Sequence, residues 1–137
     1  MGAAMAPAAL ATIKAHFSDM KVSESDFDLI VTGDLGQVGK ESLLALARKE
    51  GLSLAGKLQD CGTMVFDLQS QDVHAGGSGC GCSAITLCSE LLTKLNSGKL
   101  KRILFCGTGA LLSPTSTQQG LPIPGVCHAV CISGGEC

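Results

Sequence analysis

Short apolar segments with two different periodicities alternate along the chain, and this alternation restricts its fold more than any other feature. Leu10, Ile13 and Phe17 recur at helical spacing, which predicts a helix over residues 7–17 with Pro7 in its first turn. The β-branched run at residues 28–32, closed by a glycine, predicts a strand. Residues 38–50 predict a second helix that Gly51 ends. A helix and a strand therefore alternate from the start.

The second half of the chain continues this order. Residues 52–72 predict a loop-rich stretch with a short strand at 61–66, and residues 101–106 and 126–132 predict the last two strands. Between them a helix over residues 83–96, stopped by Gly98, is expected to bury one apolar face: Ile85, Cys88, Leu91, Leu92 and Leu95. This order predicts an α/β fold with a largely parallel sheet. Because no strand precedes the first helix, we expect the sheet to be incomplete and residues 1–137 to be one part of a longer protein.

Charge and composition exclude several classes of function. Ten basic and twelve acidic residues give a net charge of −2, and the basic residues gather only around 99–102, so nucleic acid is not an expected partner. No run approaches the roughly 20 apolar residues of a membrane-spanning helix. The eight cysteines are expected to be reduced thiols because no secretory signal is present. Five of them lie in apolar surroundings that predict burial: Cys61, Cys88, Cys106, Cys127 and Cys131. Cys137 is expected to be a frayed terminal thiol.

A glycine-rich run at residues 75–83 places four glycines and two cysteines between His74 and a helix start. Glycine has no Cβ, so another backbone, a helix or a ligand can approach the amides of such a run closely. Two nucleotide motifs nearby are incomplete. The phosphate-loop pattern requires glycine where Asp34 stands and a hydroxyl where Glu41 stands. The dinucleotide pattern at Gly79 lacks its acidic partner about twenty residues later.

The cysteines of the glycine-rich run allow three interpretations. Cys80, Cys82 and His74 are residue types that bind soft metals, but no second cysteine pair completes a four-ligand set. A helix N-terminus lowers a thiol pKa, so either cysteine could be a reactive thiolate. Close packing against a neighbouring helix is the favoured interpretation. For His74, an acid–base or carboxylate-binding role and a structural hydrogen bond remain equally open.

Six segments that span nearly the whole chain resemble the C-terminal half of the stage V sporulation protein AD family: residues 1–9, 60–62, 64–67, 74–84, 102–113 and 124–130. The run from Gly77 to Ser83 is especially specific. The family resembles thiolases and ketoacyl synthase III enzymes in fold, which implies a duplicated five-layer α/β architecture. This chain would then be the second, thiolase-like half without its first, central strand, and would be poorly stable alone.

The resemblance implies a non-enzymatic protein that binds dipicolinic acid and supports its uptake into the developing spore. It also implies partners: the other stage V A-operon proteins, the N-terminal half of the same protein, and a homodimer of the full-length form. The location implied is intracellular, at the periphery of the spore inner membrane. Thiolase-like enzymes take their nucleophile from the other half, and their second half supplies a histidine that Thr32–Gly36 lacks and an asparagine or second histidine that Ala75–Gly79 lacks. No catalytic residue, metal or cofactor is therefore expected.

Dipicolinate is a flat dianion, and amides at a helix N-terminus suit its carboxylates. The expected ligand-binding residues cluster in and near the glycine-rich run: Asp34, His74, Gly76, Gly77, Ser78, Gly79 and Cys80. Two other functions stay open, an acyltransferase and a structural scaffold at the inner membrane. Turnover of acyl-CoA would indicate an acyltransferase. Absence of both turnover and ligand binding would indicate a structural scaffold.

Overall fold

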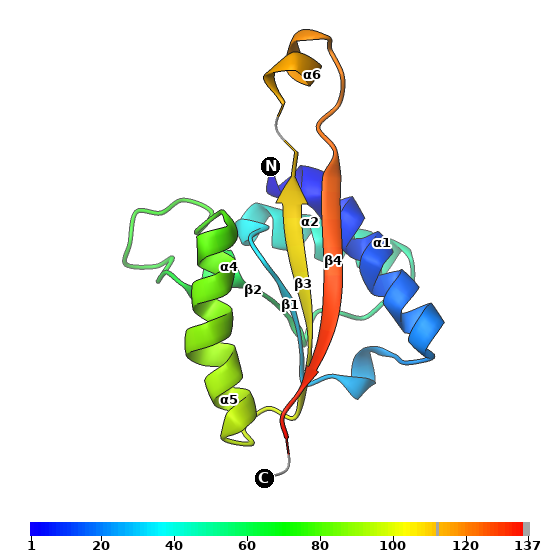
Figure 1. The fold of residues 1–137 in the computed structure, drawn as a ribbon, viewed down its shortest axis with the longest axis vertical. Coiled ribbons are helices and arrows are strands. Elements are labelled where there is room, and N and C mark those ends of the chain that lie inside the picture. Colours follow the sequence, from blue (N-terminus) through cyan, green and yellow to red (C-terminus); the bar gives the residue numbers. More distant parts are fainter. Residues whose placement is uncertain (112, 136–137) are drawn as a thin grey trace.

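A mixed four-stranded sheet organises the chain in the computed structural model, which describes residues 1–111 and 113–135. The strands in these ranges are β1 (Leu29–Thr32), β2 (Leu58–Asp60), β3 (Arg102–Ala110) and β4 (Gly125–Ser133), in the order β2-β1-β3-β4. β1 pairs in parallel with β2 and β3, whereas β4 runs antiparallel to β3 (Figure 1). The predicted α/β class is confirmed, with one antiparallel strand, β4, at the edge of the sheet.

The two central strands, β1 and β3, bond to each other directly along the whole of β1, from Leu29 opposite Ile103 to Thr32 opposite Cys106. The sheet is therefore continuous across its centre. The additional central strand that the family resemblance implies is not part of this sheet, and β1 pairs with β3 in its place.

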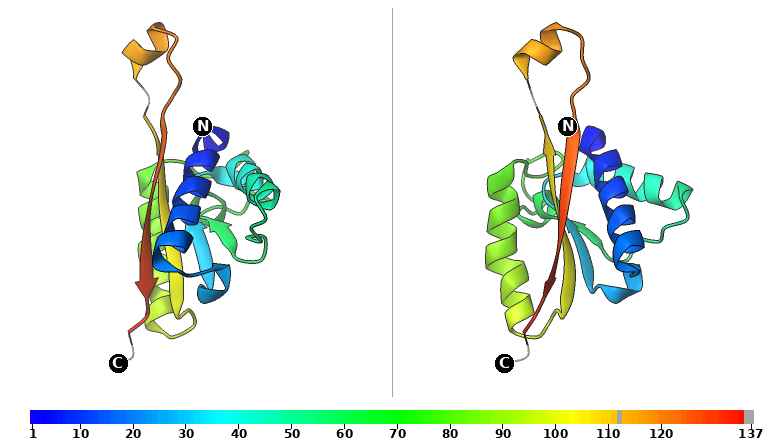
Figure 2. Two further views of the ribbon diagram at one scale, coloured as in Figure 1. Left: turned by 90° about the vertical axis from the view of Figure 1, so that its right-hand side faces the viewer. Right: turned by 45° about the vertical axis from the view of Figure 1, so that its right-hand side comes forward.

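Helices cover both faces of this sheet (Figure 2). On one face lie α1 (Gly2–Met20) and α2 (Gly36–Lys49). On the other, α4 (Cys80–Thr86), a π-helical turn (Leu87–Leu91) and α5 (Leu92–Asn96) follow one another as one helix. Ile30 packs in the core beneath α1 and α2, whereas its neighbour Val31 packs beneath Leu91 and Leu95. Successive residues of β1 thus supply two separate cores, because side chains alternate across a strand.

The first helix begins earlier than its apolar spacing predicts. Met5 and Ala6 are buried against the sheet, so α1 starts at Gly2, and Pro7 lies inside the helix instead of in its first turn. Gly2 sits directly against α2, where a Cβ would lie 2.0 Å from the Leu35 carbonyl oxygen. The close contact of the two helices, which the sequence pattern does not contain, explains the extra turn.

The short strand predicted at residues 61–66 is wrong in its position. The strand is β2, and the chain then turns into the helical turn α3 (Cys61–Met64). Thr63 Oγ1 donates a hydrogen bond to the Asp60 carbonyl oxygen (2.8 Å), which holds this turn. Side-chain bonding of this kind competes with strand pairing, and a propensity argument does not detect it.

The helix predicted over 83–96 begins at Cys80, and its buried face differs from the expected one. Leu91 and Leu95 are buried and Leu92 is half-buried, but Ile85 is 59% exposed and Cys88 is exposed. The π-helical turn at 87–91 accommodates more residues per turn than an α-helix, so the apolar positions on its two sides fall out of phase.

The cysteines divide between the core and the surface. Cys61 and Cys106 are buried as expected and Cys127 is half-buried, whereas the predicted burial of Cys88 and Cys131 is wrong. Cys131 lies on the edge strand β4, where its Sγ accepts a hydrogen bond from Arg102 Nε (3.0 Å). The prediction for Cys137 falls outside the described residues.

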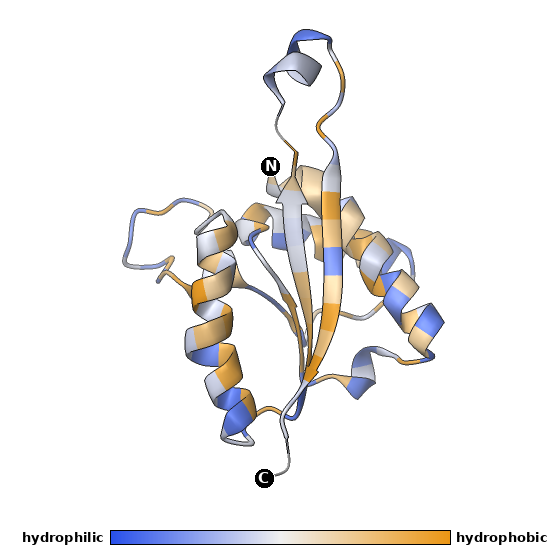
Figure 3. Ribbon diagram, in the orientation of Figure 1, coloured by the Kyte–Doolittle hydropathy of each residue, from blue (hydrophilic) through white to orange (hydrophobic). Residues whose placement is uncertain are grey.

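The β3–β4 ribbon continues past the body of the molecule into an arm that carries α6 (Pro114–Gln118) (Figure 1). The sequence contains no charged residue between Arg102 and Glu136. The strand β4 itself is mostly apolar (Figure 3). Its sequence contains one polar side chain near the middle, that of His128. In the described part of the chain, no helix combines the length and the apolar character needed to cross a membrane.

Candidate functional site

Three segments meet at the carboxyl end of β1: the residues that follow β1, the part of β3 that extends beyond its pairing with β1, and the glycine-rich turn before α4. Gly33 follows β1, and a Cβ there would lie 3.2 Å from both Ser83 Oγ of α4 and the Thr108 amide of β3. In α/β sheets this carboxyl edge of the parallel strands is the usual ligand-binding edge. The glycine-rich turn therefore lies at the place where the fold class favours a site.

Asp34 ties these segments together. Its Oδ2 accepts hydrogen bonds from the Gly79 amide (2.8 Å) and, at 3.4 Å, from the Ser78 hydroxyl. Its Oδ1 accepts a hydrogen bond from Thr108 Oγ1 (2.8 Å). The Asp34 residue is only 9% exposed. A nearly buried carboxylate thus fastens the glycine-rich turn to β3 through neutral donors.

A second carboxylate, Asp60, holds the loop that carries Asp34. Its Oδ2 accepts hydrogen bonds from Thr32 Oγ1 (2.7 Å) and the Leu35 amide (2.8 Å), and its Oδ1 accepts from the Gly36 amide (2.9 Å). Asp60 is completely buried. Because carboxylates that accept several donors are held strongly, the loop after β1 has little freedom.

Backbone contacts fix the turn from its other side. The Gly77 amide donates to the Gly62 carbonyl oxygen (2.7 Å), and the Gln37 amide donates to the Ala75 carbonyl oxygen (2.7 Å). Gly76 has φ +103°, and a Cβ there would lie 2.4 Å from the Gly62 oxygen. The close approach predicted for the glycine-rich run is therefore made by α3 and by the start of α2.

The structure brings together some of the predicted site residues. Asp34, Ser78 and Gly79 form one cluster, and Cys80 opens α4 beside it as an exposed residue. Gly76 and Gly77 serve the scaffold, because their amides already donate to the Val73 and Gly62 carbonyl oxygens.

His74 does not join the cluster. Its side chain is 91% exposed, and its Nδ1 lies 3.6 Å from an Asp72 carboxylate oxygen. Its one described polar contact is therefore with Asp72, two residues earlier in the chain, and not with Asp34, Ser78 or Gly79.

Sequence reasoning missed Asp60, Thr108 and Ser83 at this site. Asp60 ends a strand and Thr108 lies near the end of another. The position of polar residues at the carboxyl ends of parallel strands was the signal that could have found them. The strand order needed to use that signal becomes known only from the structure.

Two thiols near the site, those of Cys61 and Cys82, have raised pKa values. Burial, together with the charges of Asp60 and Asp34, raises the pKa of the Cys82 thiol. Burial first and the Asp60 charge second raise the pKa of Cys61 to about 12. These shifts argue against a reactive thiolate at Cys82. In the described residues no group of three or more histidine, cysteine, aspartate or glutamate side chains is placed to hold a metal ion.

Alkylation with iodoacetamide at pH 8 tests this distribution. Cys88 and Cys131 are exposed and should be modified readily, whereas Cys61 should react roughly a thousandfold more slowly, because a pKa of about 12 leaves little thiolate. Mass spectrometry of peptides from the native chain measures each rate, and a urea-unfolded sample is the control in which the rates should converge. Equal labelling of Cys61 and Cys88 in the native chain would contradict the assignment.

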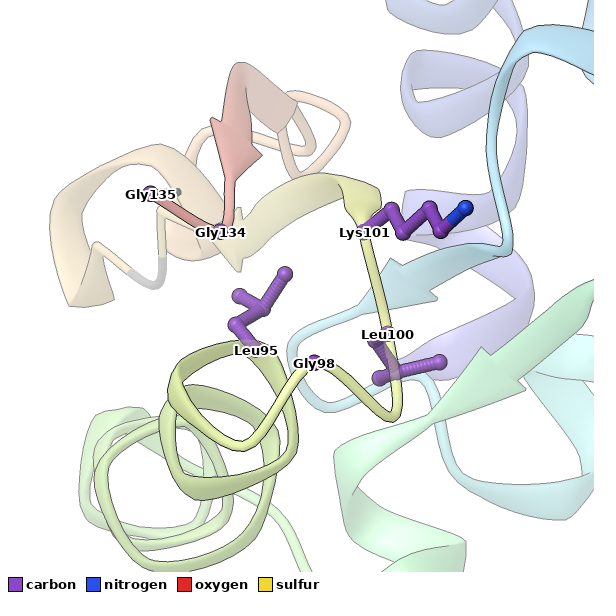
Figure 4. Close-up of a pocket in the computed structure, with 6 residues that line it drawn as sticks. All are labelled: Leu95, Gly98, Leu100, Lys101, Gly134 and Gly135. Atoms are coloured by element: carbon purple, nitrogen blue, oxygen red, sulfur yellow. The ribbon is translucent and has the colours of Figure 1, made fainter. Parts of the chain in front are cut away.

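A cavity of about 270 Å³ lies at the opposite end of the sheet, before β3 begins (Figure 4). Its lining is mostly glycine and leucine with one cation: Leu95, Gly98, Leu100, Lys101, Gly134 and Gly135. It contains none of the predicted site residues.

The fold and site define a class: an α/β chain in which a buried carboxylate fastens a glycine-rich turn at the carboxyl edge of parallel strands. A sequence profile of stage V sporulation protein AD (SpoVAD) matches residues 1–133. The stage V sporulation protein AD of Bacillus subtilis (strain 168) is 46% identical over 130 residues, which are 95% of this chain and 38% of that relative. The chain belongs to the stage V sporulation protein AD family. It spans well under half the length of this curated relative.

Proposed function

We propose that this chain supplies a dipicolinate-binding site to a non-enzymatic sporulation protein that supports uptake of dipicolinic acid into the developing spore. Membership of the family supports the sporulation role. The observation that carries the binding proposal is the start of α4 at the fastened turn. The first amides of a helix have no intrahelical acceptor and favour anions. Here the amides of Cys80 and Gly81 hold these positions, with the Ser78 hydroxyl just before them.

The residues present support binding over acyl transfer. The loop Thr32–Gly36 contains no histidine and the turn Ala75–Gly79 no asparagine, so a general base and an oxyanion donor are not supplied there. The Cys82 thiol has a raised pKa and is a poor nucleophile. We propose further that the chain acts with the N-terminal half of its protein, in a full-length homodimer, and with the other stage V A-operon proteins at the periphery of the spore inner membrane.

A proline at Cys80 tests the proposal at a single amide. Proline is well tolerated at the first position of a helix, but it removes the N–H, so Cys80→Pro deletes one donor and keeps the helix. A hydrogen bond to a charged group contributes about 1.5–3 kcal/mol, so dipicolinate should bind roughly tenfold to a hundredfold more weakly. Isothermal titration calorimetry on the 137-residue chain measures this change.

Cys80→Ala is the matched control, because it removes the same thiol but keeps the amide, and its affinity should equal that of the unmodified chain. Dipicolinate binding that Cys80→Pro leaves unchanged would refute the site. Release of CoA from acyl-CoA would favour an acyltransferase. Absence of both dipicolinate binding and CoA release would favour a structural scaffold.

A further inference from the structure

The glycine-rich turn already holds a carboxylate of its own. Asp34 Oδ2 lies 2.8 Å from the Gly79 amide, so it occupies a position that an oxygen of an anionic ligand could otherwise take. Gly79 directly precedes the helix, and the open amides of Cys80 and Gly81 follow it in the sequence. A ligand carboxylate on those amides therefore lies next to the carboxylate of Asp34.

The negative charge of Asp34 has no cationic partner among the described residues. The ion pairs there join Lys14 to Glu50, His74 to Asp72 and Lys94 to Glu90. The groups that bond Asp34 are neutral: the Gly79 amide and the hydroxyls of Ser78 and Thr108. Like charges a few ångströms apart repel each other, and more strongly near a protein interior than in water.

We propose that Asp34 is a specificity-determining residue that acts as an internal competitor at the turn. Its hydrogen bonds fix Gly79, and its charge weakens the binding of a doubly charged ligand relative to a neutral ligand of the same shape. The identity of the ligand rests on the proposed function. The occupation of the Gly79 amide by Asp34 does not.

Asp34→Asn separates the charge from the hydrogen bonds, because asparagine keeps an acceptor oxygen for the Gly79 amide. We expect Asp34→Asn to bind dipicolinate at least about tenfold more tightly than the unmodified chain. This factor corresponds to an electrostatic repulsion equal in free energy to a shift of about one pKa unit. Binding of the neutral pyridine-2,6-dicarboxamide should not change. If the unmodified chain binds dipicolinate, equal or weaker binding by Asp34→Asn overturns the proposal.

Asp28→Asn is the matched control. The Asp28 carboxylate also accepts two backbone amides, those of Lys101 (2.6 Å) and Arg102 (2.9 Å), but it precedes β1 at the opposite end of the sheet. Its replacement should leave both affinities unchanged. A gain in dipicolinate affinity equal to that of Asp34→Asn would show a general effect of net charge and overturn the assignment to Asp34.

A sulfate titration followed by the amide NMR signal of Gly79 tests the competitor without dipicolinate. Sulfate should shift this signal less in the unmodified chain, where Asp34 holds the Gly79 amide, than in Asp34→Ala, where that amide is free. An equal or larger shift in the unmodified chain overturns the proposal. If neither protein binds dipicolinate while the sulfate result is as expected, the proposed ligand is wrong and the role of Asp34 stands.

Discussion

Asp60→Ala is expected to lower the free energy of unfolding by about 3 kcal/mol or more. The change removes the acceptor of three donors, the Thr32 hydroxyl and the amides of Leu35 and Gly36, at a site with no solvent exposure. Each buried donor left without a partner costs roughly 1–3 kcal/mol. Water can offset part of this cost by entering the space left by the carboxylate. Urea unfolding followed by circular dichroism measures the loss.

Two variants calibrate this result. Asp60→Asn keeps an acceptor oxygen and should lose less stability than Asp60→Ala. Asp67→Ala removes an exposed carboxylate that accepts from the Gln69 amide and the Ser70 hydroxyl, and it should change stability little. If Asp60→Ala and Asp67→Ala proved equally stable, Asp60 would not hold the loop after β1.

Gly62→Ala is expected to displace the glycine-rich turn and to cost about 3 kcal/mol, the upper part of the range for overpacking. An added Cβ would lie 2.2 Å from the Gly77 carbonyl oxygen and 2.9 Å from Asp60 Oδ1. Neither atom can move freely, because one belongs to the backbone and the other is held by the Gly36 amide. Dipicolinate binding should fall together with stability, since the displaced turn carries Gly79.

Gly81→Ala is the matched control within the same motif. No atom lies within 4 Å of a Cβ at this position, and Gly81 is helical without a positive φ. Alanine has the higher helix propensity, by up to about 1 kcal/mol, so this variant should be as stable as the unmodified chain or slightly more so. A loss of stability in Gly81→Ala equal to that in Gly62→Ala would contradict the assignment of close contacts to Gly62.

Much of the fold could be predicted from the sequence because its signals are local. The helix at 36–49 ends before Gly51, whose φ of +78° suits glycine, and the strand at 29–32 and the first part of β3, residues 102–106, coincide with β-branched or apolar runs. The rest of β3, residues 107–110, lies beyond the predicted range and is held by its pairing with β4. The errors share one cause. The start of α1, the turn at Cys61 and the phase change at Leu87 depend on contacts with distant residues or on a hydrogen-bond pattern that spacing does not reveal.

The candidate site was predictable only in part for the same reason. Glycines in a row indicate close approach, and this led to the turn at 75–79. The amides of that turn looked available from the sequence, but Gly77 is bonded to α3 and Gly79 to Asp34. His74 stands next to the turn in sequence, yet its side chain faces solvent.

The sequence by itself determined the α/β class, the glycine-rich turn before a helix and the family to which the chain is similar, because periodicity, glycine positions and motif letters are properties of neighbouring residues. Only the tertiary structure decided which polar groups meet. Asp34 and Gly79 are 45 positions apart, and Asp34 and Thr108 are 74 apart. Asp34 meets Thr108 because β1 pairs in parallel with β3, so the residues after β1 lie beside the part of β3 beyond Cys106. Asp34 meets Gly79 because the turn before α4 packs at the same end of β1.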